Sequence, residues 1–197
     1  MTDVDRLRRA MLRPAGESSD FDLNPAIQPP AGRELRPAAV LVAVWLRPTG
    51  AELILTKRAS HLKHHPGQIA FPGGKVDSTD VSVQAAALRE AKEEIGLHPD
   101  SVEILGPLSA HETVTGFSVT PIMGLVRDDF RPFPEAGEVD EIFTVPLMHV
   151  LTIENFAVEQ RRWMGQQRRY YAVPYGPYYI WGATARILYG LAARVGS

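Results

Sequence analysis

Cysteine is absent from this chain of 197 residues, and so are long hydrophobic segments and any large excess of one charge. Without cysteine, disulfide bonds, thiol nucleophiles and zinc–thiolate sites are excluded. No apolar run approaches the roughly 18 residues that cross a bilayer as a helix, so no membrane partner is expected. The formal net charge of −2 gives no overall attraction for nucleic acid. Anion binding must therefore come from local patches.

The composition fits one globular domain. Hydrophobic residues make up 45% of the chain and charged residues 22%, which is ordinary for a protein with a single substantial core. The first residues, MTDVDRLRRAMLRP, lack the uncharged apolar segment of a secretory signal, and the last are not a peroxisomal Ser-Lys-Leu tail. We therefore expect a cytoplasmic enzyme. Residues 1–35 are predicted to form a helix ended by Pro14 and a wrapping loop, and residues 36–197 a single domain.

Three glutamates, Glu90, Glu93 and Glu94, fall within little more than one helical turn. Positions three and four apart share a helix face, so the carboxylates project in roughly one direction. Such like charges destabilise an isolated helix by about 0.2–0.5 kcal/mol per pair. A hard divalent cation such as Mg²⁺ or Mn²⁺ best offsets this repulsion. The alternative is a solvated acidic face, with Arg89 and Glu93 as an ordinary ion pair.

The surrounding sequence favours the metal site. Apolar residues recur at helical spacing away from the glutamates, which predicts an amphipathic helix over about 80–95 that is ended by Gly96. Just upstream, Gly73 and Gly74 allow a sharp turn that directs a peptide carbonyl toward the group the carboxylates hold. Loop and helix together predict a metal site aimed at a phosphate. The N-cap candidates are Ser78, Thr79 and Asp80, and the residues expected to be buried are Val81, Ala85, Leu88, Ala91 and Ile95.

This segment resembles the signature of the Nudix hydrolases. That signature reads Gly, five residues, Glu, seven residues, Arg-Glu, an apolar residue, any residue, Glu-Glu, any residue, Gly and an apolar residue. Residues 89–97, Arg-Glu-Ala-Lys-Glu-Glu-Ile-Gly-Leu, match its second half in full. Asp80 stands where the family has the first Glu, and eight residues rather than seven separate it from Arg89. The role of Asp80 is therefore left open.

The resemblance implies an α/β (α+β) fold, the Nudix-type α/β/α sandwich with a mixed β-sheet, and metal-dependent hydrolysis of a diphosphate linkage. It implies that Glu90 and Glu94 are the main ligands of Mg²⁺ or Mn²⁺, with the carbonyl of Gly73 as a further ligand. It also implies that Glu93 is an added ligand or a base. Arg89 then orients one of these glutamates.

A second motif lies upstream of the first. Residues 55–59, Leu-Thr-Lys-Arg-Ala, are followed by Lys63, Gly67 and Phe-Pro-Gly-Gly at residues 71–74. This spacing resembles the extra motif of the coenzyme A pyrophosphatase branch, and residues 179–185 resemble its closing helix. Lys63 replaces an Arg of that motif, so the charge is kept but the bidentate fork is lost. The resemblance implies Arg58, Lys63, Gly67 and Gly74 as substrate-binding residues, with Arg58 and Lys63 on the 3′-phosphate. A solvated basic loop is the alternative.

The expected substrate is therefore a small molecule: coenzyme A or a derivative, cleaved to 4′-phosphopantetheine and adenosine 3′,5′-bisphosphate. The first alternative is ADP-ribose or another nucleoside diphosphate derivative, because fold alone does not fix the substrate. The second is a non-catalytic nucleotide-binding module, which the intact Arg-Glu…Glu-Glu core argues against. The oligomeric state is open, with a homodimer as one option.

Residues 137–141, Gly-Glu-Val-Asp-Glu, precede a predicted strand and contain the candidates for a general base. Glu138 and Glu141 are three apart, so strand alternation places them on opposite faces and at most one reaches the metal. Glu138 is favoured. The alternative is a solvated acidic loop.

Other polar groups give weaker signals. The three histidines between residues 61 and 65 suggest a zinc cluster, but no cysteine or clear fourth ligand accompanies them. His111 and Glu112 open a loop, residues 113–116, that either borders the cleft or is an ordinary exposed turn.

Coarse secondary structure supports a mixed sheet between helices. Tyr179 and Trp181, near the start of the last predicted helix, are expected in the core rather than against an adenine ring. Strands are predicted over 38–46, 51–56, 102–109, 119–126, 141–146 and 168–173, and helices over 147–152 and 181–194.

Overall fold

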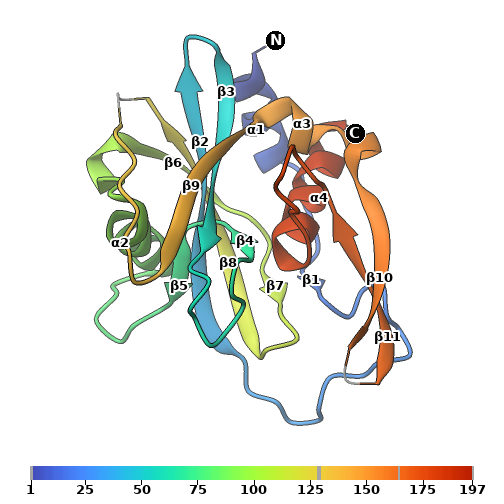
Figure 1. Cartoon of the computed structure of the whole chain (residues 1–197). Helices are drawn as coiled ribbons and strands as arrows, with labels where there is room; N and C mark the ends of the chain where they lie inside the picture. Colours follow the sequence, from blue (N-terminus) through green and yellow to red (C-terminus); the bar gives the residue numbers. More distant parts are fainter. Residues whose placement is uncertain (1, 128–129, 164, 197) are drawn as a thin grey trace.

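The computed structural model describes residues 2–127, 130–163 and 165–196. A nine-stranded mixed sheet forms its centre, and helices cover both faces (Figure 1), as the sequence predicted. The strand order is β1-β7-β8-β2-β3-β4, with β5 paired to β2, β6 to β8 and β9 to β3. The sheet strands are β1 (Ser18–Ser19), β2 (Arg36–Arg47), β3 (Gly50–Arg58), β4 (Ile69–Ala70), β5 (Gly73–Lys75), β6 (Val102–Pro107), β7 (His111–Glu112), β8 (Phe117–Val126) and β9 (Val139–Pro146).

Strand β2 lies between β8, to which it is parallel, and β3, to which it is antiparallel, and an apolar cluster covers each of its two faces. Successive side chains alternate between faces. Leu41 and Ala43 pack with the helix α2 (Val83–Ile95) in one apolar cluster. Val42 and Val44 belong to a second cluster on the opposite face. That second face is covered by three α-helices and one 3-10 helix: α1 (Asp3–Met11), α3 (Leu147–Leu151), the 3-10 helix η2 (Ile153–Asn155) and α4 (Ala183–Gly196).

The predicted amphipathic helix exists but begins later than expected. Its N-cap is Ser82, whose side chain accepts a hydrogen bond from the backbone N–H of Ala85, and Gly96 ends it with φ of 74°. Val81 therefore precedes the helix and is 94% exposed, so the prediction that it is buried is wrong. Ala85 and Leu88 are half-buried. The fully buried face consists of Ala86, Ala87, Ala91 and Ile95, joined by the polar Glu94.

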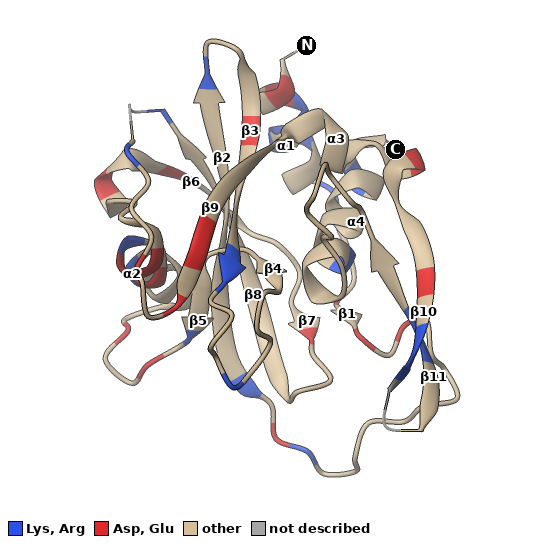
Figure 2. Cartoon of the chain, viewed as in Figure 1, with Lys and Arg blue, Asp and Glu red and all other residues tan. Residues whose placement is uncertain are grey.

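The C-terminal part contains a hairpin that the sequence predicted only in half. β10 (Ala157–Trp163) pairs antiparallel with β11 (Gln166–Ala172), whereas only a strand over 168–173 was predicted. The segment of β10 is mostly polar and shows no apolar alternation, which is the usual signal for a strand. Figure 2 shows basic residues, drawn in blue, on both strands of this hairpin.

The N-terminal helix is part of the packed structure. Thr2 and Asp5 form a capping box at its start. Leu7 and Ala10 are buried in the same cluster as residues of α4. The helix ends before Pro14, and the following segment passes along the sheet edge, where β1 pairs with β7. Among the described residues, no helix combines the length and apolar character required to span a membrane.

Candidate active site

The double glycine brings the backbone against the acidic helix. β5 pairs antiparallel with β2, with Gly73 opposite Val40. Gly73 has φ of 153°, and a Cβ atom there would lie 2.4 Å from the carbonyl oxygen of Ala39. At Gly74 a Cβ atom would lie 2.6 Å from the carboxyl carbon of Glu90. At Gly73 only glycine allows this approach, because a side chain would collide with the backbone of β2, whereas at Gly74 a side chain would displace the carboxylate of Glu90.

Glu94 is the most deeply buried acid of the site. It is 4% exposed, and its Oε2 accepts a hydrogen bond of 3.0 Å from the backbone N–H of Gly73. Burial raises the pKa of Glu94 from its ordinary 4.5 to about 8, against the opposing effect of that hydrogen bond. The nearby carboxylates of Glu90 and Glu138 raise it further. A carboxylate in this position strongly favours a proton or a cation.

Arg89 holds three carboxylates together. Its Nε and Nη2 donate to the two oxygens of Asp80 at 3.0 Å each. Its Nη1 donates to Glu90 and to Glu93, also at 3.0 Å. The side chain of Asp80 is only 5% exposed, and its hydrogen bonds with Arg89 lower the pKa of its carboxyl. The sequence left the role of Asp80 open. In the structure Asp80 fixes the guanidinium of Arg89, and this guanidinium in turn binds Glu90 and Glu93.

The residues around Gly73 fit a divalent cation. Burial raises the pKa of Glu90, and the charges of Glu93 and Glu138 add to that effect. Two partly or fully buried carboxylates beside a backbone turn are the hard oxygen donors that Mg²⁺ or Mn²⁺ prefers. Within the described part of the chain, no three His, Asp or Glu side chains already converge in metal-binding geometry. Arg89 holds Glu90 and Glu93, so these side chains would have to turn toward Glu94 to share a cation.

Glu138 and Glu141 lie apart, but not through the predicted strand alternation, because Glu138 is in the turn before β9 and only Glu141 is in the strand. The loop before β9 is fixed on the end of α2, since the N–H of Glu135 donates to the carbonyl of Glu94 at 2.9 Å. Glu138 lies close enough for its charge to raise the pKa of both Glu90 and Glu94. The carboxylate of Glu141 instead accepts a hydrogen bond of 2.6 Å from the hydroxyl of Tyr178.

The loop between β3 and β4 carries the basic upstream motif. Arg58, at the end of β3, is half-buried, and its charge opposes the rise in the pKa of Glu94. The backbone N–H of Gly67 donates to the carbonyl of Arg58 at 3.1 Å, and Gly67 has φ of 68°. Lys63 is exposed on this loop and does not line the cavity between the sheet, α4 and the β10–β11 hairpin. His61, His64 and His65 are also exposed.

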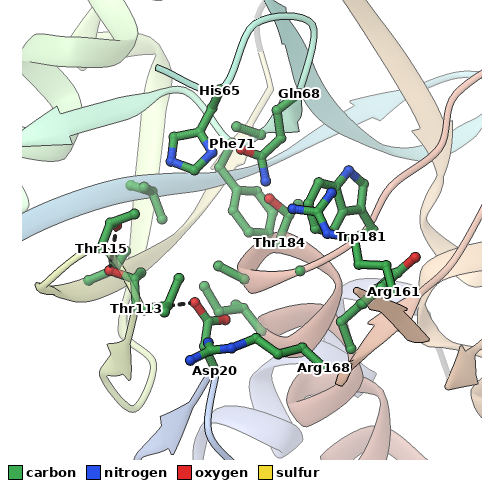
Figure 3. Close-up of a pocket in the computed structure, with 18 of the residues that line it drawn as sticks. Asp20, His65, Gln68, Phe71, Thr113, Thr115, Arg161, Arg168, Trp181 and Thr184 are labelled. Carbon is green, nitrogen blue, oxygen red and sulfur yellow. Dashed lines mark hydrogen bonds between the residues drawn. The ribbon is translucent and has the colours of Figure 1, made fainter. Parts of the chain in front are cut away.

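A cavity of about 270 Å³ opens between the sheet, α4 and the β10–β11 hairpin (Figure 3). Phe71 and Trp181 give it aromatic walls, whereas Arg161 and Arg168 from the hairpin give it positive charge. Trp181 is half-buried and Tyr179 is 45% exposed, so the prediction that both are core residues is wrong. Arg161 lies on β10, which the sequence did not predict, and Arg168 lies in the predicted strand over 168–173 but was not assigned to a site. The two Arg-Arg pairs on either side of Gly165 could have indicated them.

Buried polar side chains shape one wall of this cavity. His111 is fully buried, with one ring nitrogen 2.9 Å from the hydroxyl of Ser18 and the other 3.1 Å from the carboxylate of Asp20. Asp20 lines the cavity and also accepts a hydrogen bond of 2.8 Å from the backbone N–H of Val114. Residues 113–115 line the cavity too. The loop after Glu112 therefore borders a cleft and is not an ordinary exposed turn.

Comparisons with known proteins agree with this geometry. The family model described as NUDIX domain matches residues 35–167. Proteins named Uncharacterized Nudix hydrolase NudL from Enterobacter sp. (strain 638) and from Salmonella paratyphi B are each 44% identical to this chain over 161 residues. The match covers 82% of this chain and 83% of each relative.

A crystal structure of a Nudix hydrolase from M. smegmatis, RenU, is similar to this chain with a TM-score of 0.50 and 21% identity. The similarity covers 61% of this chain and 83% of that one, and it supports the fold alone. Nudix hydrolases act on small-molecule nucleoside diphosphate substrates and generally use divalent metal ions such as Mg²⁺ or Mn²⁺. The family match over most of the chain, together with the intact Arg-Glu…Glu-Glu core beside the double glycine, shows that this chain belongs to the Nudix hydrolase family.

Proposed function

We propose that this Nudix hydrolase cleaves the diphosphate linkage of coenzyme A or its derivatives, giving 4′-phosphopantetheine and adenosine 3′,5′-bisphosphate. The observation that carries the hydrolytic part is the contact of the double glycine with the acidic helix. The N–H of Gly73 donates to Glu94, and the carboxylate of Glu90 occupies the space that a Cβ atom on Gly74 would take. A diphosphate repels nucleophiles, so its hydrolysis needs neutralised charge and a positioned water.

The acidic residues have distinct proposed roles. Glu90 and Glu94, with the carbonyl of Gly73, would hold Mg²⁺ or Mn²⁺, and Glu93 would be an added ligand or base. When bound, the ion supplies charge neutralisation and acidifies a water molecule. Arg89 keeps the glutamates in place through its pair with Asp80. Glu138 would be the general base, and Arg58, Lys63, Gly67 and Gly74 would bind the substrate.

The preference for coenzyme A rests on the upstream motif and its place in the fold. The motif begins on β3, passes through the β3–β4 loop and ends at Gly73 and Gly74, so it connects the acidic helix to the aromatic cavity. Gln68 and Phe71 from this stretch line that cavity. The charge of Arg58 acts on Glu94, which supports a role for its guanidinium in binding the diphosphate. A substrate with a long group on each side of its diphosphate matches this extended path.

The test is a panel of coenzyme A, dephospho-coenzyme A, ADP-ribose and diadenosine substrates, assayed with Mg²⁺, with Mn²⁺ and with chelator. We expect metal-dependent release of 4′-phosphopantetheine, identified by mass, with coenzyme A as the preferred substrate. Glu94→Gln is expected to remain folded and to lose most of this activity. Cleavage of ADP-ribose with coenzyme A untouched would refute the substrate while leaving the reaction class intact.

A further inference from the structure

A groove of about 330 Å³ lies over the strands β9, β3 and β4. Its floor is a row of three residues across these strands, because Lys57 is the register partner of Glu141 on β9 and of Ile69 on β4. Figure 2 shows acidic residues, drawn in red, on β9 beside basic residues at the end of β3. The floor therefore presents an ammonium group and a carboxylate from neighbouring strands.

The wall of this groove comes from the loop between β11 and α4. Reciprocal backbone hydrogen bonds of 2.9 and 3.0 Å between Tyr175 and Tyr178 hold the loop in a turn. The ring of Tyr178 stacks on Phe143 with the ring centroids 3.5 Å apart. Trp181 lies between the groove and the aromatic cavity, since it lines both. The loop residues that line the groove are Pro177, Tyr178, Tyr179 and Trp181.

The two charges of the floor do not neutralise each other. Opposite charges at directly opposed strand positions usually attract. Among residues 2–127, 130–163 and 165–196, however, Lys57 has no hydrogen bond or ion pair. The carboxylate of Glu141 instead accepts a hydrogen bond of 2.6 Å from the hydroxyl of Tyr178 through one oxygen. Lys57 thus keeps its donors for a ligand, and Glu141 keeps its second oxygen.

This pair of charges suits a neutral ligand that both donates and accepts. Glu141 repels a phosphate, and Lys57 repels a cation. A secondary amide meets both groups, because its carbonyl oxygen accepts from the ammonium and its N–H donates to the carboxylate. The rings of Tyr179 and Trp181 offer contact area to the apolar carbons on either side of an amide. The groove therefore fits a flexible chain of amide and methylene groups.

The strands β9 and β3 connect this groove to the acidic helix. Glu138, whose charge acts on Glu94, directly precedes β9. Glu141 lies three residues further on, which is about 10 Å along an extended strand. Arg58 follows Lys57 on β3, and its charge also acts on Glu94. A substrate whose diphosphate lies beside Glu94 can therefore extend one arm along these strands into the groove.

We propose that this groove binds the pantetheine arm of coenzyme A, with Lys57 and Glu141 on one of its amide groups and Tyr179 and Trp181 beside its methylene groups. The inference rests on the proposed function and names the part of the substrate that separates coenzyme A from ADP-ribose. The volume of about 330 Å³ is within the roughly 300–1,000 Å³ common for small-molecule sites. ADP-ribose carries a ribose in place of this arm and offers no amide to the two charges.

The kinetic test compares dephospho-coenzyme A with ADP-ribose, which share the adenosine diphosphate half and differ in the group beyond it. We expect Lys57→Met to lower kcat/KM for dephospho-coenzyme A by about tenfold, at the lower end of the effect of losing one hydrogen bond to a charged group. The loss should lie mainly in KM, and kcat/KM for ADP-ribose should stay near the wild-type value. Tyr179→Ala should act in the same direction, because Tyr179 is 45% exposed and its loss removes contact area without opening the core.

Controls for this test come from the other lysines. Lys92→Met is the matched control, because Lys92 is exposed on α2 and lines neither the groove nor the aromatic cavity. Lys57→Arg keeps a charged donor and should retain most of the preference for dephospho-coenzyme A. Equal losses for dephospho-coenzyme A and ADP-ribose in Lys57→Met would overturn the inference.

A binding measurement separates this inference from the proposed reaction. Calorimetry with Mn²⁺ compares 4′-phosphopantetheine with ribose 5-phosphate, two phosphate monoesters that differ in the attached arm. We expect the wild-type protein and Lys92→Met to bind 4′-phosphopantetheine more tightly, and Lys57→Met and Tyr179→Ala to lose most of this difference. If coenzyme A is cleaved but both comparisons are unchanged in the groove variants, the inference is overturned and the proposed function stands. If no coenzyme A is cleaved but binding of 4′-phosphopantetheine depends on Lys57 and Tyr179, the groove stands and the proposed reaction fails.

Discussion

Removing the charge of Glu94 should make the metal-free protein more stable while it abolishes turnover. Glu94 is 4% exposed and is held by the backbone N–H of Gly73. In Glu94→Gln the side-chain carbonyl can accept the same hydrogen bond, and the amide has nearly the shape of the protonated acid. The substitution therefore removes the buried charge and the expected metal ligand without creating a cavity.

The pKa of Glu94 sets the size and the sign of the change in the free energy of unfolding. Burial raises it from 4.5 to about 8 in the folded protein. Between these values the folded state binds a proton that the unfolded state has lost, so stability falls as the pH rises through this window. At roughly 1.4 kcal/mol per pH unit, the free energy of unfolding should drop by about 4 kcal/mol between pH 4.5 and pH 8 on account of this group. Glu94→Gln should lack this contribution and be more stable than the wild type by a similar amount at pH 8.

The assay is urea unfolding with chelator from pH 4.5 to pH 8.5. Glu93→Gln is the control, because the side chain of Glu93 is 58% exposed and its i,i+4 pair with Arg89 is worth only about 0.3–0.5 kcal/mol. Added Mn²⁺ should stabilise the wild type by mass action and leave Glu94→Gln nearly unchanged. The reasoning is refuted if the wild type and Glu94→Gln have the same stability at pH 8, or the same dependence on pH.

Three further predictions concern the same site. Asp80→Asn should lower kcat/KM by about 10–100-fold, because Arg89 loses its bidentate partner; unaltered kinetics would show that Arg89 needs no such anchor. Gly74→Ala should weaken Mn²⁺ binding measured by calorimetry, because its Cβ atom would lie 2.6 Å from the carboxyl carbon of Glu90; wild-type affinity would place the metal elsewhere. Glu138→Gln should reduce kcat by about 10²–10⁴-fold and remove the loss of rate toward low pH; a profile of unchanged shape would exclude Glu138 as the base.

The local part of the site could be predicted from sequence because it depends on chain neighbours. Residues 89–97 lie on one helix, so their spacing alone placed three glutamates together. The helix start was less certain, because Ser78, Thr79, Asp80 and Ser82 are all acceptable caps. Only the fold selected Ser82 and left Asp80 to bind Arg89. Val81, predicted as buried from its spacing, consequently lies outside the helix and is exposed.

The sequence by itself determined the family, the mixed sheet between helices and the acidic helix behind a double glycine. The tertiary structure alone decided which distant residues share a cavity. Asp20, His65, Arg161 and Arg168 come from four separate segments of the chain and line one space. No periodicity joins them, because their proximity results from strand pairing and helix packing. The same is true of the raised pKa of Glu94, since burial is a property of the folded chain and not of the residues beside it.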